Sequence, residues 1–289
     1  ATAPSNLDNL AFDAADRLFV SNMSDNAIYE VDMARGAVRT VTASPLTLPG
    51  GIAASGDTLF VADAFTLSAV ELASGAVRDL SRSLEQNGFP TGIAAAPGRL
   101  VTVSVESGSA RLWDAAGATV LAQWSGLAQP SAVALLDADR FAVTEIGAGG
   151  RLVLLDRRDT AAREVLAEGL QQPMGIVRTA SGYLVSESAA GRIIALDDGG
   201  ARRVIASGLA RPEGIAVLAD GRIAVVETGA RRLLLVDPRD GSRRVIAAEL
   251  PLGIAGLDPA AAGIFPTGVA AGADGAIYVS ADRDGSILR

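Results

Sequence analysis

The sequence predicts an all-β protein, a β-propeller of four-stranded antiparallel blades, and three observations lead to this prediction. A unit of roughly 40 residues recurs along the whole chain. Each unit consists of short apolar runs bounded by Gly, Asp and Asn, without sustained helical spacing. A single sheet of this kind cannot bury both of its faces, so neighbouring units must stack and close a ring. We therefore expect one β-propeller domain over residues 1–289, with seven blades favoured over six.

Each repeat opens with a proline, a variable residue and usually a glycine, followed by an apolar strand. The opening prolines lie between 39 and 54 residues apart, at Pro49, Pro90, Pro130, Pro173, Pro212 and Pro266. A degenerate first copy, residues 7–11, precedes them. The last repeat stops in what should be its third strand, so residues 1–5 are expected to supply the missing outer strand.

The second strand of each repeat ends in a residue that is polar in every copy. In an antiparallel blade this end lies at the same mouth of the central channel as the start of the first strand. The expected second-strand ends are Asn22, Asp63, Ser104, Glu145, Glu187, Glu227 and Asp282. The residues that follow the opening prolines, and their counterpart in the first copy, lie beside these ends: Asp8, Gly50, Thr91, Ser131, Met174, Glu213 and Thr267.

The sequence therefore predicts an acid-rich mouth. Carboxylates that gather around a concave opening focus a negative potential, and they either bind protons more tightly or hold a cation between them. The Phe-Pro-Thr-Gly segment occurs twice and adds two phenylalanines nearby. The candidate ligand-binding residues are Asp8, Glu213, Glu145, Glu187, Glu227, Thr91, Thr267, Phe89 and Phe265. A longer insertion before Pro266, starting at Leu250, is expected to overhang the same mouth as a flap.

A structural interpretation of the strand-end acids competes with this one. Such an acid can accept backbone N–H bonds in the turn or pair with the arginine that opens the next strand. The suitably spaced pairs are Glu145 with Arg151, Glu187 with Arg192, and Glu227 with Arg232. Asp8 and Glu213 have no such arginine, so they are the stronger functional candidates.

Composition excludes several kinds of chemistry. The chain has no cysteine and no histidine, which rules out disulfides, thiolate chemistry, Ser-His-Asp triads and histidine-ligated zinc. Its net charge of −8 argues against a nucleic-acid partner, because phosphate binding needs basic clusters. No apolar stretch reaches 18 residues, so no membrane insertion is expected.

The repeats resemble those of the NHL-type propellers and of the related gluconolactonase-like, strictosidine-synthase-like and virginiamycin B lyase-like propellers. The resemblance lies in the Pro-x-Gly-Ile-Ala openings, such as residues 212–216, and in the Val-Ser/Thr-Glu strand ends followed by Arg-Leu or Arg-Ile. It covers essentially the whole chain. It is specific for the fold and says little about activity, because these families share blades and differ in chemistry.

The resemblance to the gluconolactonase-like hydrolases implies a divalent metal at the mouth. In those hydrolases a glutamate at a first-strand opening holds the metal together with Asn and Asp from other blades. Glu213 resembles that glutamate in placement, with Asn22, Asp282 and Asp63 as further candidate ligands, and Ca²⁺ or another divalent cation as the implied cofactor. The family's Glu-Gly-Pro segment is Pro212-Glu213-Gly214 here, a departure from the pattern. The virginiamycin B lyase-like enzymes depend on histidine, which this chain lacks, so their activity is not expected.

Two functions follow as hypotheses. The first is a ligand-binding or protein-interaction module that takes a small molecule or a protein segment at its acidic mouth. The second is a metal-dependent lactonase or esterase-like hydrolase in which Glu213 and Asp8 act at the same mouth. We expect a monomer. The opening residues, Ala1-Thr2-Ala3-Pro4, slightly favour an exported protein over a cytoplasmic one.

Overall fold

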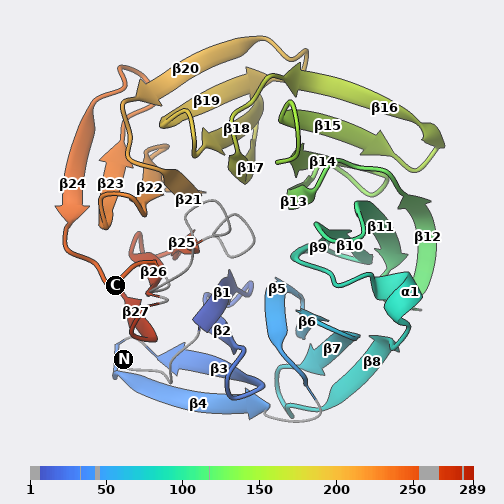
Figure 1. The fold of residues 1–289 in the computed structure, drawn as a ribbon. Coiled ribbons are helices and arrows are strands. Elements are labelled where there is room, and N and C mark those ends of the chain that lie inside the picture. The colour runs from blue at the N-terminus through green and yellow to red at the C-terminus, as the bar shows by residue number, and fades with distance from the viewer. Residues whose placement is uncertain (1–6, 33, 43–45, 117, 254–266, 282) are drawn as a thin grey trace.

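The fold is known from a computed structural model, which describes residues 7–32, 34–42, 46–116, 118–253, 267–281 and 283–289. For Asp8, Leu84 and Gln86 only the backbone is described. Figure 1 shows the sheets arranged radially around a central axis, each with its first strand innermost. No helix of the described residues is long and apolar enough to cross a membrane.

The first three blades account for the chain up to Trp124. Blade 1 contains β1 (Leu7–Phe12), β2 (Leu18–Asn22), β3 (Ala27–Asp32) and β4 (Ala37–Thr42). Blade 2 contains β5 (Pro49–Ser55), β6 (Thr58–Asp63), β7 (Leu67–Glu71) and β8 (Val77–Ser81), followed by the short helix α1 (Leu84–Asn87). Blade 3 contains β9 (Gly92–Ala96), β10 (Arg99–Ser104), β11 (Ser109–Asp114) and β12 (Thr119–Trp124).

The remaining four blades complete the ring. Blade 4 contains β13 (Pro130–Leu135), β14 (Arg140–Glu145), β15 (Arg151–Asp156) and β16 (Asp159–Glu168). Blade 5 contains β17 (Pro173–Thr179), β18 (Gly182–Glu187), β19 (Arg192–Asp197) and β20 (Arg202–Ser207). Blade 6 contains β21 (Pro212–Val217), β22 (Ile223–Glu227), β23 (Arg232–Val236) and β24 (Arg243–Ala247). Blade 7 contains β25 (Val269–Ala271), β26 (Ile277–Ala281) and β27 (Ser286–Leu288).

Within each blade the strands are paired in chain order, and every pair is antiparallel. The predicted all-β propeller is thus confirmed, with seven blades rather than six. The seventh sheet has three strands in the described part of the chain. The outer strand that we expected from residues 1–5 lies outside the described residues.

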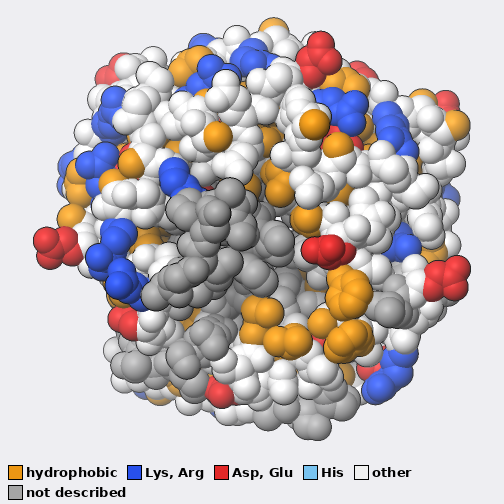
Figure 2. Space-filling view, in the orientation of Figure 1, with side chains coloured by type: hydrophobic (Ala, Val, Ile, Leu, Met, Phe, Trp, Pro, Cys, Tyr) orange, Lys and Arg blue, Asp and Glu red, His pale blue; other side chains and the backbone are white. Residues whose placement is uncertain are grey.

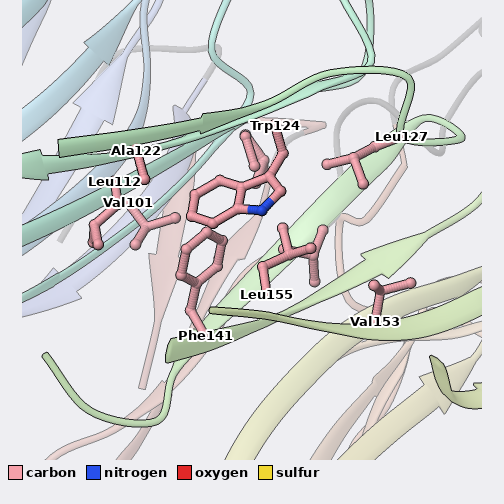
Figure 3. Close-up of a cluster of buried hydrophobic side chains, with 11 residues drawn as sticks. Val101, Leu112, Ala122, Trp124, Leu127, Phe141, Val153 and Leu155 are labelled. Atoms are coloured by element: carbon pink, nitrogen blue, oxygen red, sulfur yellow. The ribbon is translucent and has the colours of Figure 1, made fainter. Parts of the chain in front are cut away.

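The core lies between the blades, as the stacking argument requires. Trp124 of blade 3 and Phe141 of blade 4 meet edge to face, with ring centroids 5.1 Å apart, in a cluster that both blades share (Figure 3). Such aromatic pairs contribute beyond the area they bury. Because each sheet alternates its side chains between two faces, every blade supplies residues to the clusters on both sides of it.

The glycine of the Pro-x-Gly openings allows neighbouring blades to approach closely near the axis. A Cβ on Gly175 would lie 2.6 Å from the carbonyl oxygen of Glu213 in the next blade. Ser186 connects the same two strands, since its Oγ accepts from the N–H of Gly175 at 2.8 Å and donates to the Glu213 carbonyl at 2.6 Å. The opening glycine is therefore a requirement of blade packing, and the residue before it is held at the channel.

Candidate functional site

The mouth is the end of the channel where the opening prolines and the second-strand ends lie. Pro49 pairs with Asp63, and Pro173 pairs with Glu187, so these openings lie directly across from second-strand ends, as they do in blades 4 and 6. Six of the seven expected strand ends are confirmed, at Asn22, Asp63, Ser104, Glu145, Glu187 and Glu227. In blade 7 the strand ends at Ala281, and Asp282 lies outside the described residues.

The glutamate of blade 5 is fully buried and holds two separate segments of the chain. Glu187 is 0% exposed and accepts from both Nε and Nη2 of Arg192, at 2.5 and 3.0 Å. Its Oε1 also accepts the N–H of Gln171 at 2.9 Å, in the connection that leads to Pro173. The carboxylate therefore fixes the hairpin turn and the opening of the same blade.

Blades 4 and 6 repeat this arrangement. Glu145 accepts from Arg151 Nε at 2.7 Å and from the N–H of Ala128 at 2.7 Å. Glu227 pairs with Arg232 and accepts the N–H of Ala210 at 2.6 Å. These contacts are the ones that the structural interpretation expects. Ligand binding through the three glutamates stays a prediction.

Blade 2 keeps the backbone contact and lacks the arginine. Asp63 Oδ2 accepts the N–H of Thr47 at 2.6 Å, and Thr66 stands where the other blades have arginine and donates its hydroxyl at 3.3 Å. Asp63 is 0% exposed and its Oδ1 has no hydrogen-bond partner in the described residues. Burial raises the pKa of this carboxyl above its ordinary value, against the hydrogen bonds that lower it.

Glu213 lies at the boundary between blades 6 and 7. Its side chain is buried, Oε1 accepts from the Thr228 hydroxyl at 2.8 Å, and Oε2 accepts the N–H of Thr267 at 3.1 Å. Arg211 Nη2 is 3.5 Å from Oε1. The structure thus brings together two predicted site residues, Glu213 and Thr267, through a hydrogen bond that connects two blades.

Both carboxylate oxygens of Glu213 already accept hydrogen bonds, Oε1 from the Thr228 hydroxyl and Oε2 from the N–H of Thr267, and a cation would have to displace these donors. Asn22 Oδ1 accepts the N–H groups of Ser24 and Asp25, both at 2.9 Å. Across the described residues, no three His, Cys, Asp or Glu side chains are grouped so that they could hold a metal. The side chain of Asp8 and all of Asp282 lie outside the described part, so the metal site stays a prediction.

Among the described residues, two hollows lie at or near the mouth. A cavity of about 160 Å³ lies at the channel among residues of the first strands and their openings, including Asn9, Thr91 and Ser131. A groove of about 490 Å³ lies between blades 5 and 6, lined in part by Gln172 and Arg211. Thr91, a predicted ligand-binding residue, therefore does face the channel.

The residue before each opening proline has a positive φ wherever the structure describes it. These residues are Leu48 (85°), Phe89 (56°), Gln129 (55°), Gln172 (50°) and Arg211 (53°). A positive φ is uncommon for residues other than glycine, and such conformations occur often at functional positions. Sequence reasoning selected Phe89 and missed the rest of this set, although the repeating x-Pro step marks every member.

Three of the mouth's apolar side chains are exposed and lie together over blade 2 and its boundaries; we call them the apolar rim. Leu48 is 42% exposed, Phe65 46% and Phe89 40%. The rings of Phe65 and Phe89 meet edge to face with centroids 5.7 Å apart. Figure 2 shows hydrophobic side chains gathered here beside the centre of this face. Phe265, the second predicted phenylalanine, lies outside the described residues.

No protein-family model matches the sequence, and no curated protein matches it. Among solved structures, a streptogramin B lyase matches with a TM-score of 0.79 and 14% identity, over 98% of this chain and 92% of that one. A virginiamycin B lyase from Staphylococcus aureus matches with a TM-score of 0.75 and 13% identity, over 97% and 93%. The WD40 propeller domain of Doa1 matches with a TM-score of 0.71 and 12% identity, over 96% and 91%. At these identities the shared feature is the propeller fold.

Proposed function

We propose that this chain is a binding module, a propeller that holds a small molecule or a segment of a partner protein at its mouth. The observation that carries the proposal is the apolar rim. Contiguous exposed apolar patches on one face of a soluble protein often mark an interaction site. Leu48 and Phe89 are also held in a backbone conformation that their residue types rarely adopt.

The carboxylates of blades 4 to 6 support binding over catalysis. A general base or nucleophile needs a carboxylate that reaches the substrate, and each of these three is buried and already bound to an arginine and a backbone N–H. The fold occurs in enzymes and in interaction domains alike, so it favours neither. The net charge of −8 would steer cationic or amphipathic partners towards the molecule.

A selection experiment tests this proposal. A displayed library of random short peptides and a small-molecule fragment set are screened against the wild-type protein, and hits are mapped by amide chemical shifts. We expect hits that perturb mouth residues such as Thr91 and that lose binding when Phe65 is replaced by serine. Val245→Ser, which alters an exposed residue of the outer strand β24, is the matched control. A screen whose hits all map away from the mouth would refute the proposal.

The metal-dependent hydrolase remains the alternative, and it rests on the placement of Glu213. Thermal melts with millimolar Ca²⁺ and with chelator, together with assays on simple esters and lactones, decide between the two. A bound ion must stabilise the folded state by mass action. Melts that respond to Ca²⁺ in the wild type and not in Glu213→Gln, with hydrolysis lost in that variant, would favour the hydrolase.

A further inference from the structure

The apolar rim is built on a supporting network of buried polar groups. Asn87, at the end of α1, is 2% exposed, and its Nδ2 donates to the carbonyl oxygens of Phe65 and Ser81, both at 3.1 Å. One amide thus connects the turn that carries Phe65 to the connection that carries Phe89. The two rings are therefore displayed by a fixed backbone rather than by a loose loop.

Arg111 also holds the connection between β8 and β9, which carries Phe89. It is 4% exposed, and its Nη2 donates to the carbonyl oxygen of Glu85 at 3.0 Å, with Nη1 3.5 Å from that of Asn87. In the described residues its hydrogen bonds all go to neutral oxygen atoms, including those of Ser109 and Gln123. Burying a guanidinium without a carboxylate partner costs free energy of folding. The hydrogen bonds from Arg111 hold this connection in place in spite of that cost.

An exposed carboxylate lies on a segment that is joined to the one that carries Phe89. The segment that carries Glu106 is joined to the one that carries Phe89, because Ser104 Oγ donates to the carbonyl of Gly88 and the N–H of Val105 donates to Thr91 Oγ1 at 3.3 Å. Glu106 is exposed and forms no hydrogen bond or ion pair with the described residues. Figure 2 shows an acidic side chain directly beside the hydrophobic group, on the side of β9.

We propose that Phe65, Phe89 and Glu106 form a subsite for a cationic side chain, an arginine or lysine of an extended protein segment. This inference rests on the proposed function and names the chemistry that the mouth selects. An aromatic face attracts a cation through its quadrupole, and a neighbouring carboxylate adds direct charge attraction. Arg111 is buried beneath the rim and directed at backbone carbonyls, so it does not compete for the site.

The test compares two peptides that differ in one charge. The protein is titrated with acetyl-Gly-Arg-Gly-amide and with the same peptide carrying citrulline, which has the shape of arginine without its charge, at constant ionic strength. The readout is the amide chemical shifts of Phe65, Phe89 and Glu106. We expect the arginine peptide to bind about fivefold more tightly, or better, since each interaction contributes a factor of about two to five.

Two variants test whether the carboxylate and the aromatic ring each contribute to the preference for the arginine peptide. Glu106→Gln keeps the shape and removes the charge, and Phe65→Leu keeps the apolar surface and removes the ring; each should reduce the arginine preference about two- to fivefold. Val245→Ala serves as the control and should leave it unchanged. Equal binding of the two peptides, or no response at these amides, would overturn the cationic subsite. Equal binding at the mouth would still support the proposed binding function, whereas that function fails only if the library screen also finds no mouth ligand.

Discussion

The mouth is built in two different ways on its two sides. In blades 4, 5 and 6 a buried glutamate closes the second strand and is neutralised by an arginine, as Glu187 is by Arg192. In blade 2 the corresponding Asp63 is equally buried but has no arginine, and the segments it holds carry exposed apolar residues. Thr47, whose N–H it accepts, precedes Leu48, and Thr66 follows Phe65.

We infer from this difference that one side of the mouth mainly stabilises the fold and that the other is the side where the proposed ligand binds. On the arginine side the polar groups satisfy one another. On the other side a carboxylate oxygen of Asp63 has no hydrogen-bond partner among the described residues, and apolar surface stays open to solvent. Natural sequences depart from local consistency mostly where function demands it.

The largest expected effect comes from breaking one ion pair on the arginine side. Arg192→Leu leaves Glu187 buried with one backbone donor, and we expect it to lower the free energy of unfolding by about 3 kcal/mol. Urea denaturation at neutral pH measures it. The double variant Glu187→Met with Arg192→Leu should recover most of this loss, since an apolar pair can replace a buried ion pair. A single variant as stable as wild type would show that the pair does not hold the blade.

Removing only the charge of the strand-end carboxylate should have a smaller effect on the free energy of unfolding, and this effect should differ between the two sides of the mouth. Glu187→Gln loses a charge-assisted hydrogen bond and should cost about 2 kcal/mol. Asp63→Asn keeps a carbonyl oxygen for the N–H of Thr47 and faces no arginine, so its cost should stay below about 1 kcal/mol or become a gain. The same urea titrations compare the variants. Equal losses in both would remove the distinction between the sides.

The raised pKa of Asp63 predicts a pH dependence with a defined sign. Between the ordinary value of 3.8 and the raised native value, the folded state holds the proton while the unfolded state has released it. Stability from this group is therefore present below pH 3.8 and is lost as the pH rises through the native pKa. The unfolding free energy of the wild type is compared with that of Asp63→Asn at each pH. The wild-type value minus the variant value should fall as the pH rises across this window. A difference that rises with pH would contradict the assignment.

The smallest effect is expected at the apolar rim itself. Leu48→Asn should change the free energy of unfolding by less than about 0.5 kcal/mol, because the side chain is largely exposed and asparagine tolerates a positive φ better than leucine. Thermal and urea unfolding measure this. A loss comparable to that of Arg192→Leu would mean that the rim belongs to the core.

The fold and the strand ends could be predicted from the sequence because each repeats. In blade 7 the position of the strand-end acid is taken by an alanine. The N–H of Gly268 donates to Ser280 Oγ as the N–H of Gly175 donates to Ser186 Oγ in blade 5, so the residue equivalent to Glu187 is Ala281. Reasoning from the acid alone led to Asp282 instead.

The apolar rim could be predicted only in part. A residue before proline ordinarily prefers an extended backbone, so the positive φ of Leu48 could not be foreseen from local rules. It depends on contacts between segments, such as the N–H of Leu48 donating to Asn26 Oδ1 at 2.9 Å. Phe65 was missed because it lies in a turn outside the repeat's opening.

The repeated step before each opening proline gives this molecule a set of interchangeable positions. Their backbone shape recurs from Leu48 to Arg211 while their side chains range from leucine and phenylalanine to glutamine and arginine. In a propeller that binds as proposed, exchanging these few side chains would change the ligand that is recognised without redesigning a single blade.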